Sequence, residues 1–299
     1  MKYFLLLIIS QLMARFPDAV GTNGMVVSSH KLASEAGLRI LKDGGNAIDA
    51  AIATGFALAV VHPGAGNIGG GGFMVIRLTD GTVTTIDFRE TAPAAAFKDM
   101  FLDDSLNVVP DKSWNTAWAA GVPGSVAGFG YAHEKYGSMH WKNLVNPSIQ
   151  LAEKGFPLDF QNMMSLNTPY FHDYLSNDPE TEKIFTQDEP FEINELFYQK
   201  DLGRTLDRIA NSGWREFYTG KTAEMIEKCM QRTDGLITKE DLQNYRAVER
   251  EPIVFKYRGY EVHSMPPASS GGVTIAGILN QLEHVGFDSL NYHSAQHIH

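Results

Sequence analysis

The segment 46–88, NAIDAAIATGFALAVVHPGAGNIGGGGFMVIRLTDGTVTTIDF, decides the fold of this chain. Residues 50–61 are apolar or small at nearly every position, which predicts a helix buried on most sides and packed closely against a neighbour. Asn46 can cap the start of this helix, and Pro63 ends it because proline cannot continue a helix. The sequence therefore predicts a buried helix over the first part of this segment.

A glycine-rich loop and a β-hairpin follow the predicted helix. Four consecutive glycines occupy positions 69–72. Residues 73–78 and 83–88 have a strand-like composition, and the Asp-Gly pair between them is a strong hairpin signal. The predicted order is helix, glycine loop, hairpin, with Arg89 at the end of the second strand.

The loop contains the pattern G-x-G-x-x-G at 64–69, which is also the fingerprint of dinucleotide-binding proteins. That fingerprint needs a strand before it and a helix after it, so that the pyrophosphate meets the N-terminus of the helix. Here the predicted order is reversed, and nucleotide binding is therefore not expected. Consecutive glycines instead allow two backbones to approach closely or to bend sharply.

Helices are predicted on both sides of this segment. A helical pattern opens at Ser29 and ends at a Gly-Gly pair, and Thr238 is a good N-cap for a helix over 239–245. The other predicted elements are helices over 125–136, 143–154, 202–210, 222–230 and 273–284, and a second hairpin of 252–257 with 260–265. Residues 156–200 predict short helices and loops. No composition break marks a linker, which favours one continuous domain.

Composition and charge exclude several classes of protein. The chain has 299 residues, of which 43% are apolar and 20% charged, as in ordinary globular proteins. Its net charge of −10, without a cluster of Lys and Arg, argues against a nucleic-acid partner. The single cysteine excludes an intrachain disulfide and a cysteine-based zinc site.

The N-terminus has the pattern of a signal peptide. Lys2 precedes the apolar run 3–9, which is far shorter than the roughly 20 residues that a transmembrane helix needs. Ala14 and Ala19 offer small-residue cleavage sites. We therefore expect residues 1–19 to direct export to the periplasm or the cell exterior; the alternative is an ordinary buried strand.

Two features resemble known site motifs and are better explained otherwise. Ser125 lies near a helix start, but Pro123 replaces the glycine that a nucleophile-elbow motif needs, so we expect a serine N-cap. His293 and His297 have the spacing of helical metal ligands but lack the glutamate of the metalloprotease motif. We expect surface or partner-facing histidines there, and no metal site.

Arg89 is the best candidate for a binding residue. An arginine at a strand end beside a glycine-rich turn can hold a carboxylate through two parallel N–H···O bonds. An internal salt bridge with Glu90 or a nearby acid is the alternative. The residues alone favour neither.

Several segments together resemble the γ-glutamyltransferase family, also called glutathione hydrolases. They occur in the order of that family and span nearly the whole chain after residue 19: 24–77, TIDFRETAP at 85–93, GVPGSVAGF at 121–129, DGLITKEDLQNY at 234–245, and YRGYEVHSMPPASSGG at 257–272. The resemblance implies that residues 20–299 are part of a family large subunit.

The resemblance also implies a fold and a chemistry. Such proteins are N-terminal nucleophile hydrolases of the α+β class, with a four-layer αββα sandwich that this chain fills incompletely. A precursor cleaves itself, and the new N-terminal threonine attacks the γ-glutamyl amide of glutathione or a related compound. Its own α-amine can act as the general base, and no cofactor or metal is implied. Water or an amino acid then resolves the acyl-enzyme.

The chain lacks the part of the family pattern that carries the nucleophile. No Thr-Thr-His or Thr-Ser-His stretch occurs, and Thr84-Thr85 is followed by Ile86 inside a predicted strand. The resemblance therefore assigns no catalytic residue here and makes a small subunit the missing partner. We expect the chain alone to be inactive. Arg89 corresponds to the family arginine that grips the α-carboxylate of the γ-glutamyl group.

Three functions remain open at this point. The first is γ-glutamyl transfer and hydrolysis by a protein of which this chain is the N-terminal part. The second is a related acylase of the same fold, such as a cephalosporin-type acylase. The third is a non-catalytic fragment that at most associates with a partner.

Overall fold

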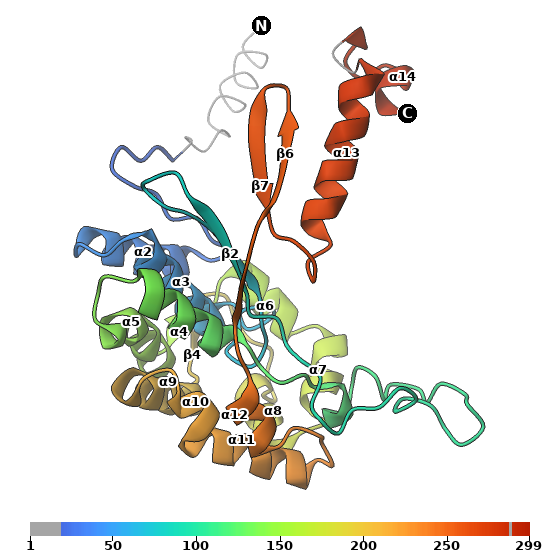
Figure 1. The fold of residues 1–299 in the computed structure, drawn as a ribbon. Coiled ribbons are helices and arrows are strands. Elements are labelled where there is room, and N and C mark those ends of the chain that lie inside the picture. The colour runs from blue at the N-terminus through green and yellow to red at the C-terminus, as the bar shows by residue number, and fades with distance from the viewer. Residues whose placement is uncertain (1–18, 287–288) are drawn as a thin grey trace, which may run out of the picture.

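Figure 1 shows the computed structural model, which describes residues 19–286 and 289–299. The predicted signal peptide, 1–19, lies outside the described residues except for its last position. Helices dominate, and the strands form small antiparallel sheets, so the chain is α+β as expected. Within the described ranges, no helix combines the length and the apolar character that crossing a membrane requires.

The predicted buried helix is α3 (Ala47–Val61), and ten of its fifteen residues are buried. Its start is closed by a capping box. The Asn46 side chain accepts hydrogen bonds from the backbone N–H groups of Ile48 and Asp49, at 2.9 and 3.0 Å, and the Asp49 carboxylate accepts one from the backbone of Asn46 at 3.0 Å. Both the burial and the cap predicted for this helix are confirmed.

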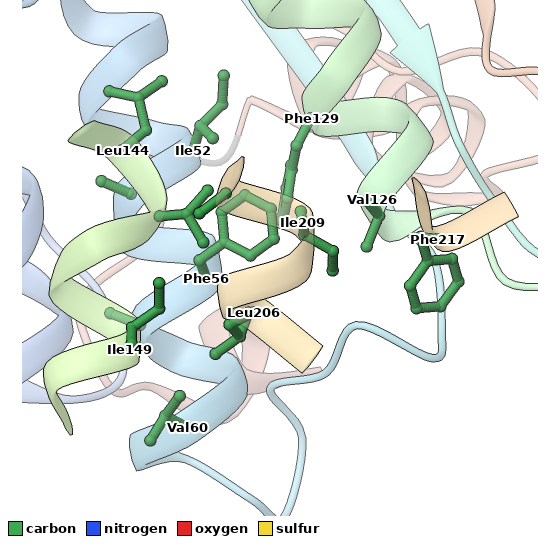
Figure 2. Packing of buried hydrophobic residues seen from close by; sticks show 14 of the residues in the cluster. Ile52, Phe56, Val60, Val126, Phe129, Leu144, Ile149, Leu206, Ile209 and Phe217 are labelled. Atoms are coloured by element: carbon green, nitrogen blue, oxygen red, sulfur yellow. The ribbon is translucent and has the colours of Figure 1, made fainter. Parts of the chain in front are cut away.

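Helices α2 (Lys31–Lys42), α4 (Ser125–Tyr136) and α5 (Trp141–Lys154) pack against α3, and α9 (Lys200–Ser212) packs against α5. Together the five helices form the core. Figure 2 shows Phe56 of α3 among side chains from α4, α5 and α9. Phe56 is fully buried, and the rings of Phe129 and Trp141 meet it edge-on. Helix α2 begins two residues after Ser29, where the predicted helical pattern opens, because His30 is the N-cap and its imidazole accepts the N–H of Leu32.

The predicted first hairpin is confirmed as β1 (Phe73–Arg77) and β2 (Val83–Asp87). A third strand, β5 (Val248–Arg250), pairs antiparallel with β2. The register places Thr85 opposite Arg250. The sequence did not predict β5, because a strand of three residues carries almost no alternating pattern. It forms because β2 offers it a free edge.

We call the helices between residues 31 and 244 the helical body. Helix α4 of this body packs against β2 of the three-stranded sheet. The short helices predicted within 156–200 are present as α6 (Phe160–Leu166), α7 (Pro169–Leu175) and α8 (Pro179–Phe185). The same region also contains two unpredicted two-residue strands, β3 (Phe156–Pro157) and β4 (Leu196–Phe197), which pair with each other, and the short helix η1 (Ala117–Ala119) precedes α4. The later helices of the body are α10 (Glu216–Thr219), α11 (Lys221–Arg232) and α12 (Lys239–Asn244). Helix α12 has the predicted Thr238 cap, completed by Asp241.

The C-terminal segment extends away from the helical body (Figure 1). It contains the second predicted hairpin, β6 (Ile253–Tyr257) with β7 (Tyr260–Ser264), then α13 (Gly271–Val285) and α14 (Ala295–Ile298). Helix α13 packs on the hairpin. Val254, Tyr260, Val273 and Ile278 nevertheless expose half or more of their surface. We call residues 253–285 the C-terminal arm.

Candidate functional site

The glycine-rich loop closes the N-terminus of helix α4. The carbonyl oxygen of Gly70 accepts hydrogen bonds from the backbone N–H groups of Gly124 and Ser125, at 2.7 and 3.0 Å. The side chain of Asn67 accepts the N–H of Gly70 at 2.7 Å and thereby holds the loop in its bend. The loop therefore binds protein backbone, which supports its structural interpretation.

Ser125 is not the N-cap that the sequence predicts. The cap position is Gly124, and Ser125 is the first residue of the helix. Its hydroxyl donates to the side-chain oxygen of Asn67 at 3.2 Å. The prediction was wrong because the N–H groups that a serine cap at this position would serve already have acceptors. The Tyr218 hydroxyl accepts the N–H of Ala127, and the carbonyl of Gly124 accepts the N–H of Gly128.

Two glycines bring three segments together at Phe88, the residue before Arg89. A Cβ atom at Gly124 would lie 2.0 Å from the carbonyl oxygen of Phe88, and one at Gly71 would lie 2.6 Å from it. Real Cβ atoms do not approach oxygen so closely, so only glycine fits at either position. The predicted close approach of backbones at the glycine loop is therefore present.

The backbone of Arg89 is held on both sides. Its N–H donates to the Asp87 carboxylate at 3.0 Å, and its carbonyl oxygen accepts the phenolic O–H of Tyr245 at 2.8 Å. Asp87 is buried and also accepts a hydrogen bond from Nε of Arg250 at 2.9 Å. A local contact with Asp87, which Arg250 holds in turn, and a contact from the distant Tyr245 thus fix the peptide that carries the Arg89 side chain.

Tyr245 is itself held by a second tyrosine. Its ring stacks on that of Tyr218, with centroids 5.7 Å apart and planes inclined by 15°. The Tyr218 hydroxyl donates to the carbonyl of Pro123 at 2.9 Å and accepts the N–H of Ala127 at 3.0 Å. Burial raises the pKa of both phenols, so both stay protonated and Tyr245 remains a donor to Arg89.

The side chain of Arg89 is exposed, unlike its backbone, and lines a cavity of about 580 Å³. No ion pair joins it to Glu90 or to any other acid in residues 19–286 and 289–299. The other lining residues are mostly small or apolar: Gly69, Glu90, Thr91, Ala92, Pro93, Ala96, Met100, Phe101, Trp118, Ala119, Ala120 and Gly121. The cavity therefore presents a guanidinium beside an apolar wall.

A neighbouring cavity of about 390 Å³ shares Gly69, Ala120 and Gly121 with the first. Its lining is mainly apolar, and it contains the single cysteine, Cys229. Its arginine, Arg208, is already engaged by Glu216 and Thr222. Its charge is therefore less available to a ligand than that of Arg89.

The threonine pair in β2 has structural partners. The Thr84 hydroxyl donates to Glu249 at 2.6 Å, and the Thr85 hydroxyl donates to the carbonyl of Arg250 at 2.7 Å. Both threonines are buried and tie β2 to β5. They are not placed as nucleophiles.

No set of three or more His, Cys, Asp or Glu side chains in the described ranges could hold a metal ion. His293 and His297 do lie together, since the backbone N–H of His293 donates to Nδ1 of His297 at 3.4 Å. The stacked ring of Tyr292 covers His293, with centroids 4.0 Å apart. These contacts order the C-terminal turn locally.

The sequence predicted Arg89 as a candidate binding residue but did not predict the two residues that hold its backbone. Asp87 and Tyr245 both lie inside the quoted family-like stretches, TIDFRETAP and DGLITKEDLQNY. Nothing local distinguishes either of them from an ordinary strand aspartate or helix-end tyrosine. Only their contacts across the fold reveal their role.

Comparison with known proteins places the chain in a family. The model of the gamma-glutamyltranspeptidase family matches residues 33–299. The glutathione hydrolase proenzyme of Escherichia coli is 49% identical over 273 residues, covering 91% of this chain and 47% of that protein. The acylase ACY 1 proenzyme of a Pseudomonas species is 38% identical over 295 residues, covering 94% of this chain and 51% of that protein. The chain thus spans about half the length of these curated relatives.

The fold agrees with these matches. The crystal structure of Helicobacter pylori gamma-glutamyltranspeptidase superposes with a TM-score of 0.91 at 45% identity, covering 94% of this chain and 81% of that one. The expected α+β fold of the N-terminal nucleophile hydrolase type is confirmed. The chain belongs to the gamma-glutamyltranspeptidase family and covers its large-subunit portion.

Proposed function

We propose that the chain is the large-subunit part of an enzyme that transfers and hydrolyses γ-glutamyl groups through a threonine acyl-enzyme. Glutathione and other γ-glutamyl amides are the proposed substrates. One observation carries the proposal: the Arg89 backbone is fixed from both sides, while its guanidinium lines a cavity and has no ion pair within residues 19–286 and 289–299. No cofactor or metal is needed for this chemistry.

The proposed role of Arg89 is to hold the α-carboxylate of the γ-glutamyl group. A planar guanidinium binds a carboxylate through two parallel hydrogen bonds and so fixes both its position and its orientation. A rigid backbone under the arginine reduces the freedom lost when the substrate binds. The γ-amide is then presented at a defined distance from the carboxylate, as attack by a fixed nucleophile requires.

The proposed partner is a small subunit from the same precursor, which supplies the attacking threonine. The buried threonine pair, Thr84 and Thr85, cannot serve, because both hydroxyls are engaged between strands. The exposed apolar residues of the C-terminal arm offer a surface that such a subunit would cover. The apolar run at 3–9 supports export of the protein.

The experiment compares the isolated chain with a complete precursor, in which the rest of a family large subunit and then a small subunit follow residue 299. Release of p-nitroaniline from γ-glutamyl-p-nitroanilide is measured for both, beside a vector-only preparation. We expect subunit cleavage and hydrolysis in the complete precursor. A well-folded, cleaved protein that does not hydrolyse this substrate would contradict γ-glutamyl transfer.

A related acylase is the second candidate, and the 38% identity to the acylase ACY 1 proenzyme favours keeping it. A glutaryl group has the same chain as a γ-glutamyl group but lacks the α-amine. Hydrolysis of glutaryl-p-nitroanilide in preference to γ-glutamyl-p-nitroanilide would support the acylase. If the complete precursor hydrolyses neither compound, the result would favour the third function, a non-catalytic fragment.

A further inference from the structure

The cavity at Arg89 is larger than a γ-glutamyl group requires. Ligand pockets usually have volumes of roughly 300–1,000 Å³ and enclose most of a drug-sized ligand. With about 580 Å³, this cavity has room for a substantial group in addition to the part of the substrate that Arg89 holds. The nature of that group follows from the rest of the lining.

The charged residues of the lining itself are Arg89 and its sequence neighbour Glu90. The large apolar residues of the lining are Met100, Phe101 and Trp118, and we call these three residues the apolar wall. Met100 is buried, whereas Phe101 and Trp118 are half-buried. A charged or strongly hydrated group would lose its water against such a wall without compensation.

The indole of Trp118 is held in a defined orientation. Its N–H points to the Asp234 carboxylate, with 3.4 Å between Nε1 and Oδ2. Nζ of Lys112 lies 3.9 Å from the ring centroid, and the ring of Phe97 meets the indole edge-on at 6.3 Å. An aromatic ring that is already fixed loses little conformational freedom when a ligand packs on it.

We propose that the wall of Met100, Phe101 and Trp118 receives the amine portion of the substrate, the part released when the γ-glutamyl amide is cleaved. The preferred substrates are then γ-glutamyl compounds whose amine carries an aromatic or large aliphatic side chain. This inference rests on the proposed function, because it places the γ-glutamyl carboxylate at Arg89. It adds Trp118 as a specificity-determining residue.

The contact between Trp118 and the amine portion of the substrate should change kcat/KM. All γ-glutamyl amides give the same acyl-enzyme, so the step that resolves this intermediate does not depend on the amine. A contact between the amine portion and Trp118 must therefore appear in kcat/KM, which contains the acylation step, and kcat is unaffected where deacylation limits turnover. Packing of one side chain in an apolar pocket changes kcat/KM by roughly tenfold.

The test uses the complete precursor and two dipeptides, γ-glutamyl-phenylalanine and γ-glutamyl-glycine, with glutamate release as the readout. We expect kcat/KM to favour the phenylalanine compound by about tenfold in the unaltered protein. Trp118→Ala should bring the ratio close to one while the value for γ-glutamyl-glycine stays nearly constant. Trp118→Phe, which keeps an aromatic ring, should retain most of the preference.

Trp114→Ala is the matched control. Trp114 lies four positions before Trp118 and packs on Tyr174, with centroids 4.8 Å apart, and it does not line the cavity. Its replacement should leave the ratio unchanged. A merely structural role of Trp118 would lower kcat/KM for both dipeptides together, and that result would overturn the inference. So would the absence of any preference in the unaltered protein.

The outcomes separate the inference from the proposed function. Hydrolysis of both dipeptides with a ratio insensitive to Trp118 removes the specificity wall and leaves the γ-glutamyl activity standing. Failure to hydrolyse either dipeptide by a cleaved, folded protein removes both.

Discussion

The hydroxyl of Tyr245 donates a 2.8 Å hydrogen bond to the carbonyl oxygen of Arg89, joining residues 156 positions apart. Asp87 holds the N–H of the same residue at 3.0 Å. Arg89 therefore combines a fixed backbone with an exposed side chain that has no ion pair among the described residues. This arrangement suits a residue that positions a ligand. An internal salt bridge would instead pair the guanidinium with a protein carboxylate and leave it less available to a ligand.

Replacement of Arg89 in a complete precursor should impair substrate use and spare self-cleavage. A hydrogen bond to a charged group contributes about 1.5–3 kcal/mol, so Arg89→Ala should lower kcat/KM roughly 10- to 150-fold for one lost bond, and more for two. Arg89→Lys should recover only part of the loss, because lysine keeps the charge without the two-pronged geometry. Cleavage is followed on a gel beside the kinetics. Normal kcat/KM in a folded Arg89→Ala protein would remove Arg89 from the site.

Tyr245→Phe should weaken catalysis through the position of Arg89. The variant loses the hydrogen bond to the Arg89 carbonyl and keeps the stacking on Tyr218. A net contribution of about 0.5–1.5 kcal/mol predicts a decrease in kcat/KM of roughly 2- to 13-fold. Tyr198→Phe, at an exposed tyrosine outside the cavity lining, is the control and should have no effect. A loss of thermal stability with unchanged kcat/KM would make Tyr245 purely structural.

The isolated chain should show no γ-glutamyl activity and should self-associate. The exposed apolar surface of the C-terminal arm includes Val254 and Ile278, which expose 50% and 52% of their surface. Such surface drives association when nothing covers it. Light scattering after size-exclusion chromatography measures this, and Ile278→Glu should reduce the association without changing the melting of the helical body. A monodisperse, cooperatively melting monomer at micromolar concentration would contradict the expectation.

Stability should depend on pH through Glu249, a half-buried residue of β5. Burial raises its pKa, but hydrogen bonds from Lys135, Thr84, Tyr136 and Tyr131 outweigh burial and lower the pKa to about 2. A folded-state pKa below the unfolded value of about 4.3 means that the stabilisation is complete above that pH and lost as pH falls toward 2.

Glu249→Gln tests this dependence by urea unfolding at a series of pH values. The variant should lose about 1.5–3 kcal/mol of unfolding free energy at pH 7, as for a hydrogen bond to a charged group. The difference from the unaltered chain should shrink as pH falls through the interval from 4.3 to 2. Glu251→Gln, at an exposed neighbour, should show neither effect. A difference that is constant with pH would exclude the carboxylate as its source.

The sequence alone determined the features that depend on near neighbours. The apolar run at 50–61 and the Asn46 cap specify α3, because burial and capping involve residues a few positions apart. The Asp-Gly turn specifies the first hairpin for the same reason. The quoted motifs also indicated the family, and with it Arg89 as the candidate binding residue.

The tertiary structure decided what depends on contacts between distant segments. The three-residue strand β5 exists because β2 offers an edge. Ser125 is not a cap because the Tyr218 hydroxyl, from a distant helix, accepts the N–H of Ala127 that a serine cap would have served. No pattern in the sequence predicts the hydrogen bond from Tyr245 to Arg89. Nor does any pattern predict that Trp118 lines the same cavity as Arg89. Local preferences reflect a few neighbouring side chains, whereas these contacts arise only once the whole core has packed.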